Sequence, residues 1–226
     1  MFYHDLLMNF FQEIGEEKGI IFQKNLPAVE PVYGELRNPL HWRLEEILKK
    51  GNLTRFYSHQ VDAINAIKEG KNIVISTRTA SGKSLCYNLP VIESIMGNIS
   101  NKALYIFPSK ALAQNQSARL EKYNYAFYYG DFSYGIYDGD TPKEIRKKLR
   151  KNASIIITTP DMLHTGILPN HEKWKHFFQN LKFVVLDELH TYRGIFGSNI
   201  ACVLRRFRRI CHHYGSNPQF ICSSAT

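Results

Sequence analysis

The chain has 226 residues, 44% of them hydrophobic, with 29 lysines and arginines against 20 aspartates and glutamates. That length suits one domain with a substantial core, or one domain with a small appendage. The hydrophobic share excludes an intrinsically disordered chain. The formal net charge of +9 favours a polyanionic partner, nucleic acid first, although many basic proteins are simply soluble.

The spacing of the cysteines and the length of the apolar runs indicate the cellular compartment of the protein. No Cys-x-x-Cys pair occurs, and the run Cys211-His212-His213 lacks the spacing of metal ligands. We interpret the cysteines as reduced thiols. No apolar run approaches the roughly 18 residues of a membrane span, and the start of the chain lacks the basic head of a signal peptide. The sequence therefore predicts an intracellular, cytoplasmic protein with no membrane partner.

The first fifty residues differ in pattern from the rest of the chain. Apolar residues at helical spacing predict a short amphipathic helix over residues 2–14. Three prolines indicate an extended connector over residues 20–40, and residues 41–50 show a helix that ends on a basic turn before a glycine. We expect residues 1–54 to be an accessory segment, partly helical, packed on a core domain of residues 55–226.

Strand and helix patterns alternate through the core domain. Several apolar segments lack polar alternation, which is typical of a parallel sheet covered by helices on both faces. Strands are expected at residues 73–76, 103–107, 125–129, 134–137, 154–158, 183–186 and 219–222. Helices are expected from a Ser58 cap, from residue 85 with Pro90 ending or kinking it, over 111–123, from a Thr141 cap, and over 198–213. The predicted fold is therefore α/β with a mostly parallel sheet between helices.

Residues 77–84 lie between a predicted strand and a predicted helix. The free amides and the dipole at a helix start attract anions. Gly82 lets the backbone approach a phosphate, Lys83 is placed to reach the β- and γ-phosphates, and the Ser84 hydroxyl is placed to hold Mg²⁺. Thr77 stands where the motif has glycine, and the alternative is a chance Gly-Lys-Ser turn. The flanking strand and helix favour a P-loop for a nucleoside triphosphate.

Two adjacent carboxylates, Asp187 and Glu188, follow the predicted strand 183–186. Side chains at the carboxyl edge of a parallel sheet face the ligand crevice. A P-loop enzyme needs a carboxylate for Mg²⁺ and a group that orients or activates water. Asp187 fits the first role and Glu188 the second. Alone, the pair would favour a solvated acidic turn, but the P-loop in the same chain favours catalysis.

Taken together, these motifs resemble those of one family. The P-loop, the run Asp187-Glu188-Leu189-His190 and the run Ser224-Ala225-Thr226 resemble a superfamily 2 helicase of the DEAD/DEAH-box kind, in which the glycine replaced here by Thr77 is often missing. Residues 57–60 resemble the Q-motif, 107–112 resemble motif Ia, and 137–142 and 158–161 resemble later strand-contacting motifs. Each is weak alone, but their order is highly specific. Over about residues 30–226 the chain most resembles the YprA/MrfA-type branch, which is related to the RecQ-like helicases.

The resemblance implies a RecA-like P-loop domain that uses ATP and Mg²⁺. The residues implied to bind ATP, with Gln60 reading the adenine, are Gln60, Tyr57, Thr79, Ala80, Ser81, Gly82, Lys83 and Ser84. The residues implied to act in catalysis are Lys83, Asp187 and Glu188, and those implied to hold the metal are Ser84 and Asp187. The residues implied to couple the ATP site to nucleic acid are His190, Ser224 and Thr226. The residues implied to touch the backbone of a single strand are Pro108, Ser109, Lys110, Gly139, Asp140, Thr159 and Pro160.

Two groups of these strand contacts have a structural alternative. Ser109 and Lys110 could merely cap a helix, and Thr158, Thr159 and Pro160 could merely end a strand. The whole chain also has alternatives: a nucleic-acid-binding module that does not use ATP, or a translocase subunit of a restriction or repair assembly. The resemblance favours DNA, single-stranded or duplex, without excluding RNA.

The resemblance also implies a second RecA-like lobe in cis, which would supply an arginine finger. Such a finger is worth about 10³–10⁵ in rate in well-studied phosphoryl-transfer enzymes. The chain ends directly after the third main motif, so we expect the N-terminal ATP-binding lobe of a longer helicase. We expect this lobe alone to bind nucleotide weakly and to turn over little or no ATP.

Overall fold

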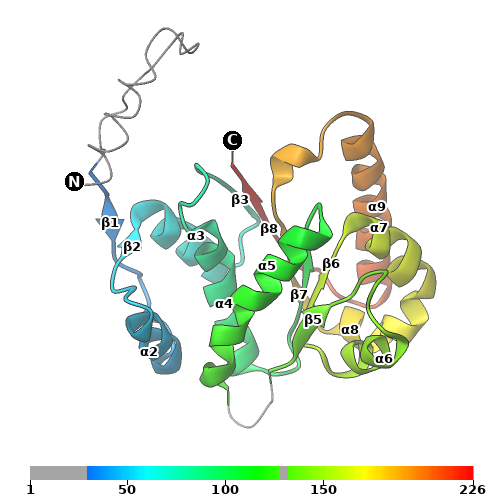
Figure 1. The fold of residues 1–226 in the computed structure, drawn as a ribbon, viewed down its shortest axis with the longest axis horizontal. Coiled ribbons are helices and arrows are strands. Elements are labelled where there is room, and N and C mark those ends of the chain that lie inside the picture. Colours follow the sequence, from blue (N-terminus) through cyan, green and yellow to red (C-terminus); the bar gives the residue numbers. More distant parts are fainter. Residues whose placement is uncertain (1–29, 128–131, 226) are drawn as a thin grey trace, which may run out of the picture. The chain divides into compact units, whose positions relative to one another are not determined.

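A six-stranded parallel sheet lies at the centre of the computed structural model, which describes residues 30–127 and 132–225 (Figure 1). Every pairing within this sheet is parallel. In spatial order the strands are β3 (Ile73–Ser76), β8 (Gln219–Ser224), β7 (Leu181–Leu186), β4 (Lys102–Ile106), β6 (Ile155–Thr158) and β5 (Tyr134–Ile136). The predicted α/β fold with a mostly parallel sheet is confirmed. All the elements belong to the unit of residues 33–226.

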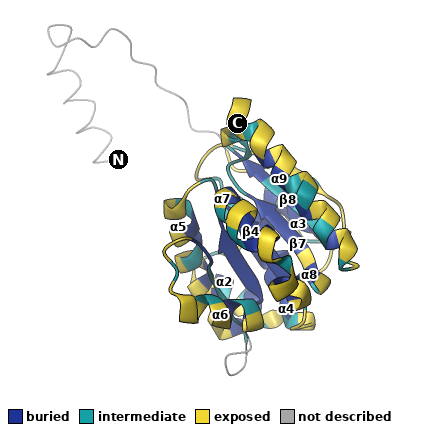
Figure 2. Ribbon diagram, turned by 90° about the vertical axis from the view of Figure 1, so that its right-hand side faces the viewer, coloured by how far each residue is buried: buried dark blue, intermediate teal, exposed yellow. Residues whose placement is uncertain are grey.

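The central strands are buried on both faces, which explains their unbroken apolar sequence. Every residue of β4 and of β6 is buried, and β7 is exposed only at Lys182. Side chains on a strand point alternately to the two faces. Accordingly Val185 packs into one hydrophobic cluster and its neighbour Val184 into the other. Figure 2 shows these buried strands between helices whose outer surfaces are exposed.

Helices cover the two faces of the sheet as separate groups. One cluster receives side chains from α2 (Trp42–Lys50), α3 (Ser58–Lys68), α4 (Lys83–Gly97) and α5 (Lys110–Glu121). The other receives side chains from α6 (Lys143–Asn152), α8 (Lys175–Gln179) and α9 (Gly194–His213). This arrangement is the one predicted for a sheet covered on both faces.

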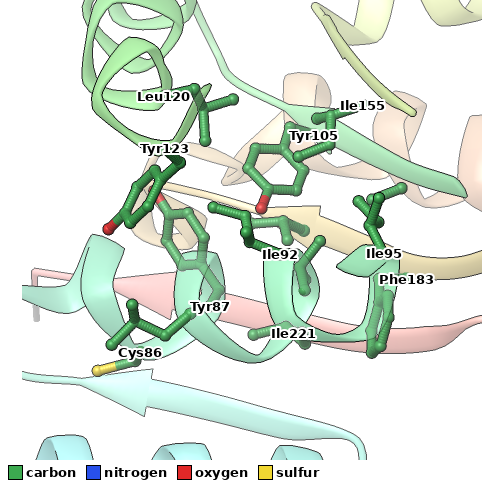
Figure 3. Packing of buried hydrophobic residues seen from close by; sticks show 14 of the residues in the cluster. Cys86, Tyr87, Ile92, Ile95, Tyr105, Leu120, Tyr123, Ile155, Phe183 and Ile221 are labelled. Carbon is green, nitrogen blue, oxygen red and sulfur yellow. The ribbon is translucent and has the colours of Figure 1, made fainter. Parts of the chain in front are cut away.

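The first cluster contains an unusual group of fully buried tyrosines (Figure 3). Tyr87 of α4, Tyr105 of β4 and Tyr123 have no exposed surface. The rings of Tyr87 and Tyr105 meet edge to face, with centroids 5.5 Å apart and planes at 88°. Edge-to-face contact is a favoured geometry for aromatic pairs. These rings fix α4, which begins at the P-loop, against the sheet.

Two predicted helix caps, Ser58 and Thr141, are wrong. Ser58 is the first residue of α3, and the residue before it is Tyr57, whose N–H donates to Oε1 of Gln60 at 3.0 Å. Thr141 does not cap α6, because its hydroxyl lies within hydrogen-bonding distance of the Ile136 carbonyl, at 2.9 Å, and of Oδ1 of Asp138, at 2.8 Å. In both places a competing side-chain hydrogen bond to a nearby backbone group determines the local structure.

The predicted effect of Pro90 is also partly wrong, because α4 does not end there but continues to Gly97. Residues 125 and 126, expected in a strand, belong to the 3₁₀ helix η2 (Lys122–Ala126), and the rest of that prediction up to residue 129 includes positions outside the described residues. The helix expected over residues 41–50 is confirmed as α2. The helix expected over residues 2–14 lies outside the described residues.

Some elements were not predicted. Residues 160–174 form α7 (Pro160–Met162), the π-helical turn η3 (Leu163–Ile167) and the 3₁₀ segment η4 (Leu168–Trp174). Two short strands, β1 (Tyr33–Gly34) and β2 (Phe56–Tyr57), pair antiparallel next to α3. Within residues 30–127 and 132–225, no helix is both long and apolar enough to cross a membrane.

The packing around Phe207 allows a stability test. Phe207 of α9 is fully buried and meets the rings of Phe178 and Phe220 at centroid distances of 6.0 and 6.4 Å. Phe207→Ala should lower the free energy of unfolding by about 3–5 kcal/mol, because it removes apolar contacts and leaves a cavity. Ile195→Ala on the same helix, at a side chain 85% exposed, should change it by less than about 0.5 kcal/mol. Urea unfolding, monitored by circular dichroism, measures the free energy of unfolding of both variants. Equal losses in the two variants would contradict the assigned packing of α9.

Candidate functional site

The predicted site residues lie along the carboxyl edge of the sheet in two adjacent groups. Because all six strands are parallel, the segments that follow them emerge at the same edge. The P-loop follows β3, Asp187 and Glu188 follow β7, and Ser224 ends β8, and these three strands are neighbours. The predicted strand-contacting segments follow β4, β6 and β5, which form the other half. We call the first group the nucleotide half and the second the strand half.

The P-loop turn is held by its own side chains and by β8. Gly82, immediately before α4, has a φ of 79°, and Ala80 has a φ of 60°. Positive φ is unstrained for glycine but costs a non-glycine residue about 1–3 kcal/mol. The Thr77 N–H donates to the Ser224 carbonyl at 3.3 Å, and the hydroxyls of Thr77 and Ser81 lie 2.6 Å apart. Thr77, which replaces the glycine of the motif, therefore closes the loop through its hydroxyl.

Lys83 lies against the backbone of this loop. Its Nζ donates to the carbonyls of Thr77 at 2.7 Å and Arg78 at 2.8 Å. The ammonium group is thus held against the turn that precedes the helix, where anionic phosphates are attracted. The neighbouring Ser84 hydroxyl accepts a hydrogen bond from Nη1 of Arg119, a residue of α5, at 3.3 Å.

Gln60 joins α3 to the P-loop. Its side chain is 2% exposed. Its Nε2 donates to the Ser81 carbonyl at 3.3 Å, while its Oε1 accepts from Tyr57. The ring of Tyr57 stacks with those of Tyr33 and His59 at centroid distances of 5.4 and 5.7 Å. An amide oxygen has two lone pairs, so adenine reading by Gln60 remains compatible with these contacts and stays a prediction.

Asp187 is the most extensively bonded carboxylate of the nucleotide half. Its Oδ1 accepts from the Glu188 N–H at 2.9 Å and from the Ser223 hydroxyl. Its Oδ2 accepts from the Tyr87 hydroxyl at 3.1 Å. Burial, together with the nearby Asp187, raises the pKa of Tyr87 well above its ordinary value, so the phenol keeps the proton that it donates. Donors on both oxygens fix the orientation of the carboxylate.

Glu188 has an unusual backbone and a carboxylate oxygen without a donor. Its φ of 53° lies in the left-handed region, a conformation that is strained for this residue type and clusters at active sites. Its Oε2 is buried without a hydrogen-bond partner, although it lies 3.4 Å from Nδ1 of His190. The Ala225 N–H points to the same Nδ1 at 3.4 Å. Because a backbone N–H can only donate, Nδ1 accepts there, which leaves Oε2 of Glu188 available to accept another proton donor.

His190 lies between the end of β7 and the end of β8. Besides Glu188 and Ala225, its Nδ1 lies 3.4 Å from the Ser224 hydroxyl. The Ser224 carbonyl in turn receives the N–H of Thr77 in the P-loop. These contacts join three predicted site segments, while Thr226 lies outside the described residues.

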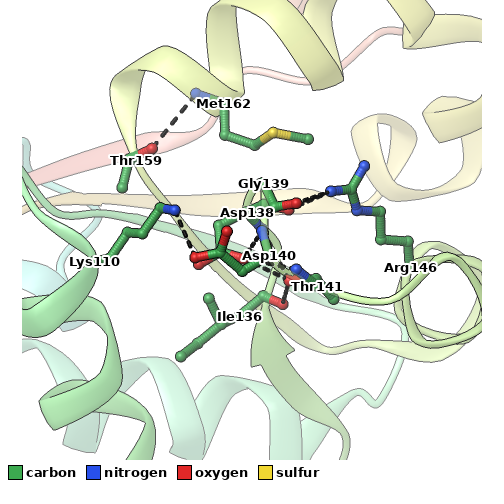
Figure 4. A network of polar contacts seen from close by, with 9 residues as sticks. All are labelled: Lys110, Ile136, Asp138, Gly139, Asp140, Thr141, Arg146, Thr159 and Met162. Atoms are coloured by element: carbon green, nitrogen blue, oxygen red, sulfur yellow. Dashed lines mark hydrogen bonds and ion pairs between the residues drawn. The ribbon is translucent and has the colours of Figure 1, made fainter.

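In the strand half, the turn after β5 is held rigidly (Figure 4). The buried carboxylate of Asp138 accepts from the N–H groups of Asp140 and Thr141, each at 3.0 Å, and its Oδ1 lies 2.8 Å from the Thr141 hydroxyl. Arg146 of α6 donates to the carbonyls of Asp138 at 2.7 Å and Gly139 at 2.8 Å. This turn is therefore preformed.

Lys110 and Asp140 connect two of the predicted strand-contacting segments. The Lys110 Nζ lies 2.6 Å from Oδ2 of Asp140, and both side chains are largely exposed. The hydrogen bond and charge of Asp140 raise the pKa of Lys110, so this amine stays protonated. Two further members of this group, Ser109 and Thr159, accept from N–H groups of the helices that follow them, each at 3.4 Å. Ser109 therefore has the capping role that the sequence allowed as an alternative, and Thr159 caps α7, which the sequence analysis did not predict.

Several residues at this edge were not predicted as site residues. Tyr87 and Ser223 bind Asp187, Arg119 binds Ser84, and His59 lies 3.1 Å from the Ser81 carbonyl through its Nε2. Tyr87 is one helical turn after Ser84, and such spacing places both on one helix face. That signal was present in the sequence, whereas the position of Arg119 depends on how α5 packs.

Fold and site together define a P-loop α/β domain of the nucleotide-using type. The model of the DEAD/DEAH box helicase family matches residues 57–226, and the chain belongs to this family. A Bacillus subtilis (strain 168) protein described as an uncharacterized ATP-dependent helicase YprA is 52% identical over 216 residues, which cover 94% of this chain and 29% of that protein. The ATP-dependent helicase hrq1 of Schizosaccharomyces pombe is 42% identical over 226 residues, covering 97% of this chain and 21% of that protein.

The fold has a close counterpart among solved structures. The crystal structure of the DUF1998 helicase MrfA bound to DNA and AMPPNP superposes with a TM-score of 0.87 at 46% identity, covering 95% of this chain and 30% of that one. The RecA-like fold and the resemblance to the YprA/MrfA-type branch are thereby confirmed. The chain spans less than a third of the length of each of these relatives.

Proposed function

We propose that this chain is the N-terminal ATP-binding lobe of an ATP-dependent DNA helicase, which couples Mg-ATP hydrolysis to translocation along a strand and unwinding. The observation that carries the proposal is the division of one sheet edge into a nucleotide half and an adjoining strand half. The relative MrfA has been crystallised with DNA and AMPPNP together, which supports both ligands for this lobe. In this proposal residues 1–54 are an accessory segment and residues 55–226 are the ATP-binding lobe.

The residues of the nucleotide half fit Mg-ATP. Lys83 would contact the phosphates, and Ser84 and Asp187 would hold the ion, with the loop residues 79–82 around the phosphates and Gln60 and Tyr57 at the adenine. When bound, Mg²⁺ neutralises charge that develops on the phosphates. Glu188 would orient the attacking water and accept its proton at Oε2, the oxygen that lacks a donor in the structure.

A second RecA-like lobe in cis would complete the site. The P-loop of this lobe carries two cations, Arg78 and Lys83, and an arginine finger from a second lobe contributes about 10³–10⁵ in rate in related phosphoryl-transfer sites. We therefore expect little or no turnover from this chain alone. His190, Ser224 and Thr226 would couple nucleotide state to the strand, since contacts of His190 and Ser224 already join β7, β8 and the P-loop.

The residues of the strand half would contact the sugar-phosphate backbone of a single strand. These residues are Pro108, Ser109, Lys110, Gly139, Asp140, Thr159 and Pro160. Lys110 is the cation among them, and lysine contacts to phosphate add affinity without sequence preference. The net charge of +9 also favours binding to the phosphates of a nucleic acid. DNA is favoured over RNA because the MrfA structures contain DNA.

Lys83→Ala tests the use of ATP. The wild-type chain should bind Mg-ATP in a calorimetric titration, and the variant should show no measurable binding, because it lacks the cation that meets the phosphates. Lys147→Ala, which removes an exposed lysine from α6 on the other side of the sheet, is the matched control and should bind like the wild type. Equal binding by all three would contradict the role of Lys83 in holding the phosphates.

Asp140→Asn tests the strand half. A phosphate should compete with Asp140 for Lys110, so removing the carboxylate charge should increase the affinity for a labelled oligothymidylate at low salt about two- to fivefold, the range of a surface ion pair. Asp161→Asn removes the same charge from an exposed residue after β6 that has no ion pair among the described residues, and should give a smaller gain. Fluorescence anisotropy measures both. A gain for Asp161→Asn that matched or exceeded the gain for Asp140→Asn would contradict a specific role for Lys110.

A further inference from the structure

The border between the nucleotide half and the strand half runs between the neighbouring strands β7 and β4. Tyr87 lies at this border, with its hydroxyl within reach of Asp187 after β7 and of Gln116 on α5, the helix that follows β4. We propose that Tyr87 is a positioning residue for the metal site, holding Oδ2 of Asp187 in the orientation that Mg-nucleotide binding requires. The proposal rests on the function proposed above, in which Asp187 holds Mg²⁺.

The Tyr87 ring is enclosed in the core. It is completely buried, and the edge-to-face contact with Tyr105 fixes its plane. Figure 3 shows it enclosed by Tyr105, Tyr123 and Ile92. A buried polar group that is held in this way either makes its hydrogen bond or loses the free energy of hydration without compensation. The bond to Asp187 is therefore a fixed feature of the lobe.

The Tyr87 hydroxyl has one proton and two candidate acceptors. Oδ2 of Asp187 lies at 3.1 Å and Oε1 of Gln116 at 3.4 Å. A phenol donates one hydrogen bond, and a carboxylate is a stronger acceptor than an amide. The shorter distance and the charge both direct the proton to Asp187.

Gln116, whose Oε1 lies 3.4 Å from the Tyr87 hydroxyl, is itself fixed by a buried network. Nε2 of Gln116 donates to Oδ1 of Asn88 at 2.9 Å, and the Tyr105 hydroxyl donates to the same oxygen at 3.1 Å. Gln116 and Asn88 are each 2% exposed, and Tyr105 is fully buried. Groups that hydrogen-bond to metal ligands orient those ligands, and removal of such a group typically lowers the metal affinity about 10–100-fold.

The test compares two buried hydroxyls of this network. Tyr87→Phe removes the donor to Asp187 and keeps the ring. Tyr105→Phe is the matched control, because it removes a buried hydroxyl that does not bind Asp187. The readout is the binding of a non-hydrolysable ATP analogue to the 226-residue chain, titrated with Mg²⁺ and repeated in EDTA, with thermal melting of each variant.

Tyr87→Phe should raise the Mg²⁺ concentration at half-saturation about tenfold, as expected for a residue that orients a metal ligand, and leave binding in EDTA unchanged. Tyr105→Phe should leave the Mg²⁺ dependence unchanged even where it lowers the melting temperature. Ser223→Ala, which removes a donor to the other oxygen of Asp187, should act in the same direction as Tyr87→Phe and gives a second variant in case one folds poorly.

The proposal is overturned if Tyr87→Phe and Tyr105→Phe shift the Mg²⁺ dependence equally, or if Tyr87→Phe weakens binding to the same extent in EDTA, since either result marks a role in packing alone. A wild-type chain that binds the analogue no better than Lys83→Ala would overturn the proposed function itself, and the role of Tyr87 would fall with it.

Discussion

Parallel pairing of all six strands is the constraint on which the rest of this lobe depends. It requires helices on both faces, which is why β4, β6 and β7 are apolar with almost no polar alternation. It also brings every segment that follows a strand to the same edge. The P-loop, the carboxylate pair and the turns that follow β4, β5 and β6 are far apart in the sequence, yet they lie along one edge because of this single property of the sheet.

The order of the strands then determines which of these segments lie next to one another. β7 and β4 are neighbours, so Asp187 and α5 lie on either side of one border. Tyr87, Gln116, Asn88 and Tyr105 fill the space below that border with a buried hydrogen-bonded network. Networks of this kind cost free energy if partly satisfied and add rigidity if complete. In this lobe the network joins α4, which starts at the P-loop, to α5, which starts at Lys110.

Much of the fold and of the nucleotide half could be predicted from the sequence, because both depend on local patterns. Apolar runs marked the strands of the sheet, apart from residues 125 and 126, which belong to η2, and Gly82-Lys83-Ser84 and Asp187-Glu188 were the predicted residues that the sheet brings to one edge. The caps at Ser58 and Thr141 were wrong because Gln60 and Ile136 offer competing hydrogen bonds that residue type alone does not reveal. Tyr87 was missed because an aromatic residue in an apolar helix indicates core packing, and its bond to Asp187 depends on a contact 100 residues along the chain.

Hydrogen exchange measured by mass spectrometry, on the chain with Mg²⁺ and a non-hydrolysable ATP analogue and separately with an oligothymidylate, tests the division of the sheet edge most directly. The nucleotide should protect amides in residues 77–84, 187–190 and 223–225, which follow or end β3, β7 and β8. The oligonucleotide should protect residues 107–112, 137–142 and 158–161, which follow β4, β5 and β6. Direct protection of the P-loop by the oligonucleotide alone, or of the turn at 137–142 by the nucleotide alone, would contradict the account.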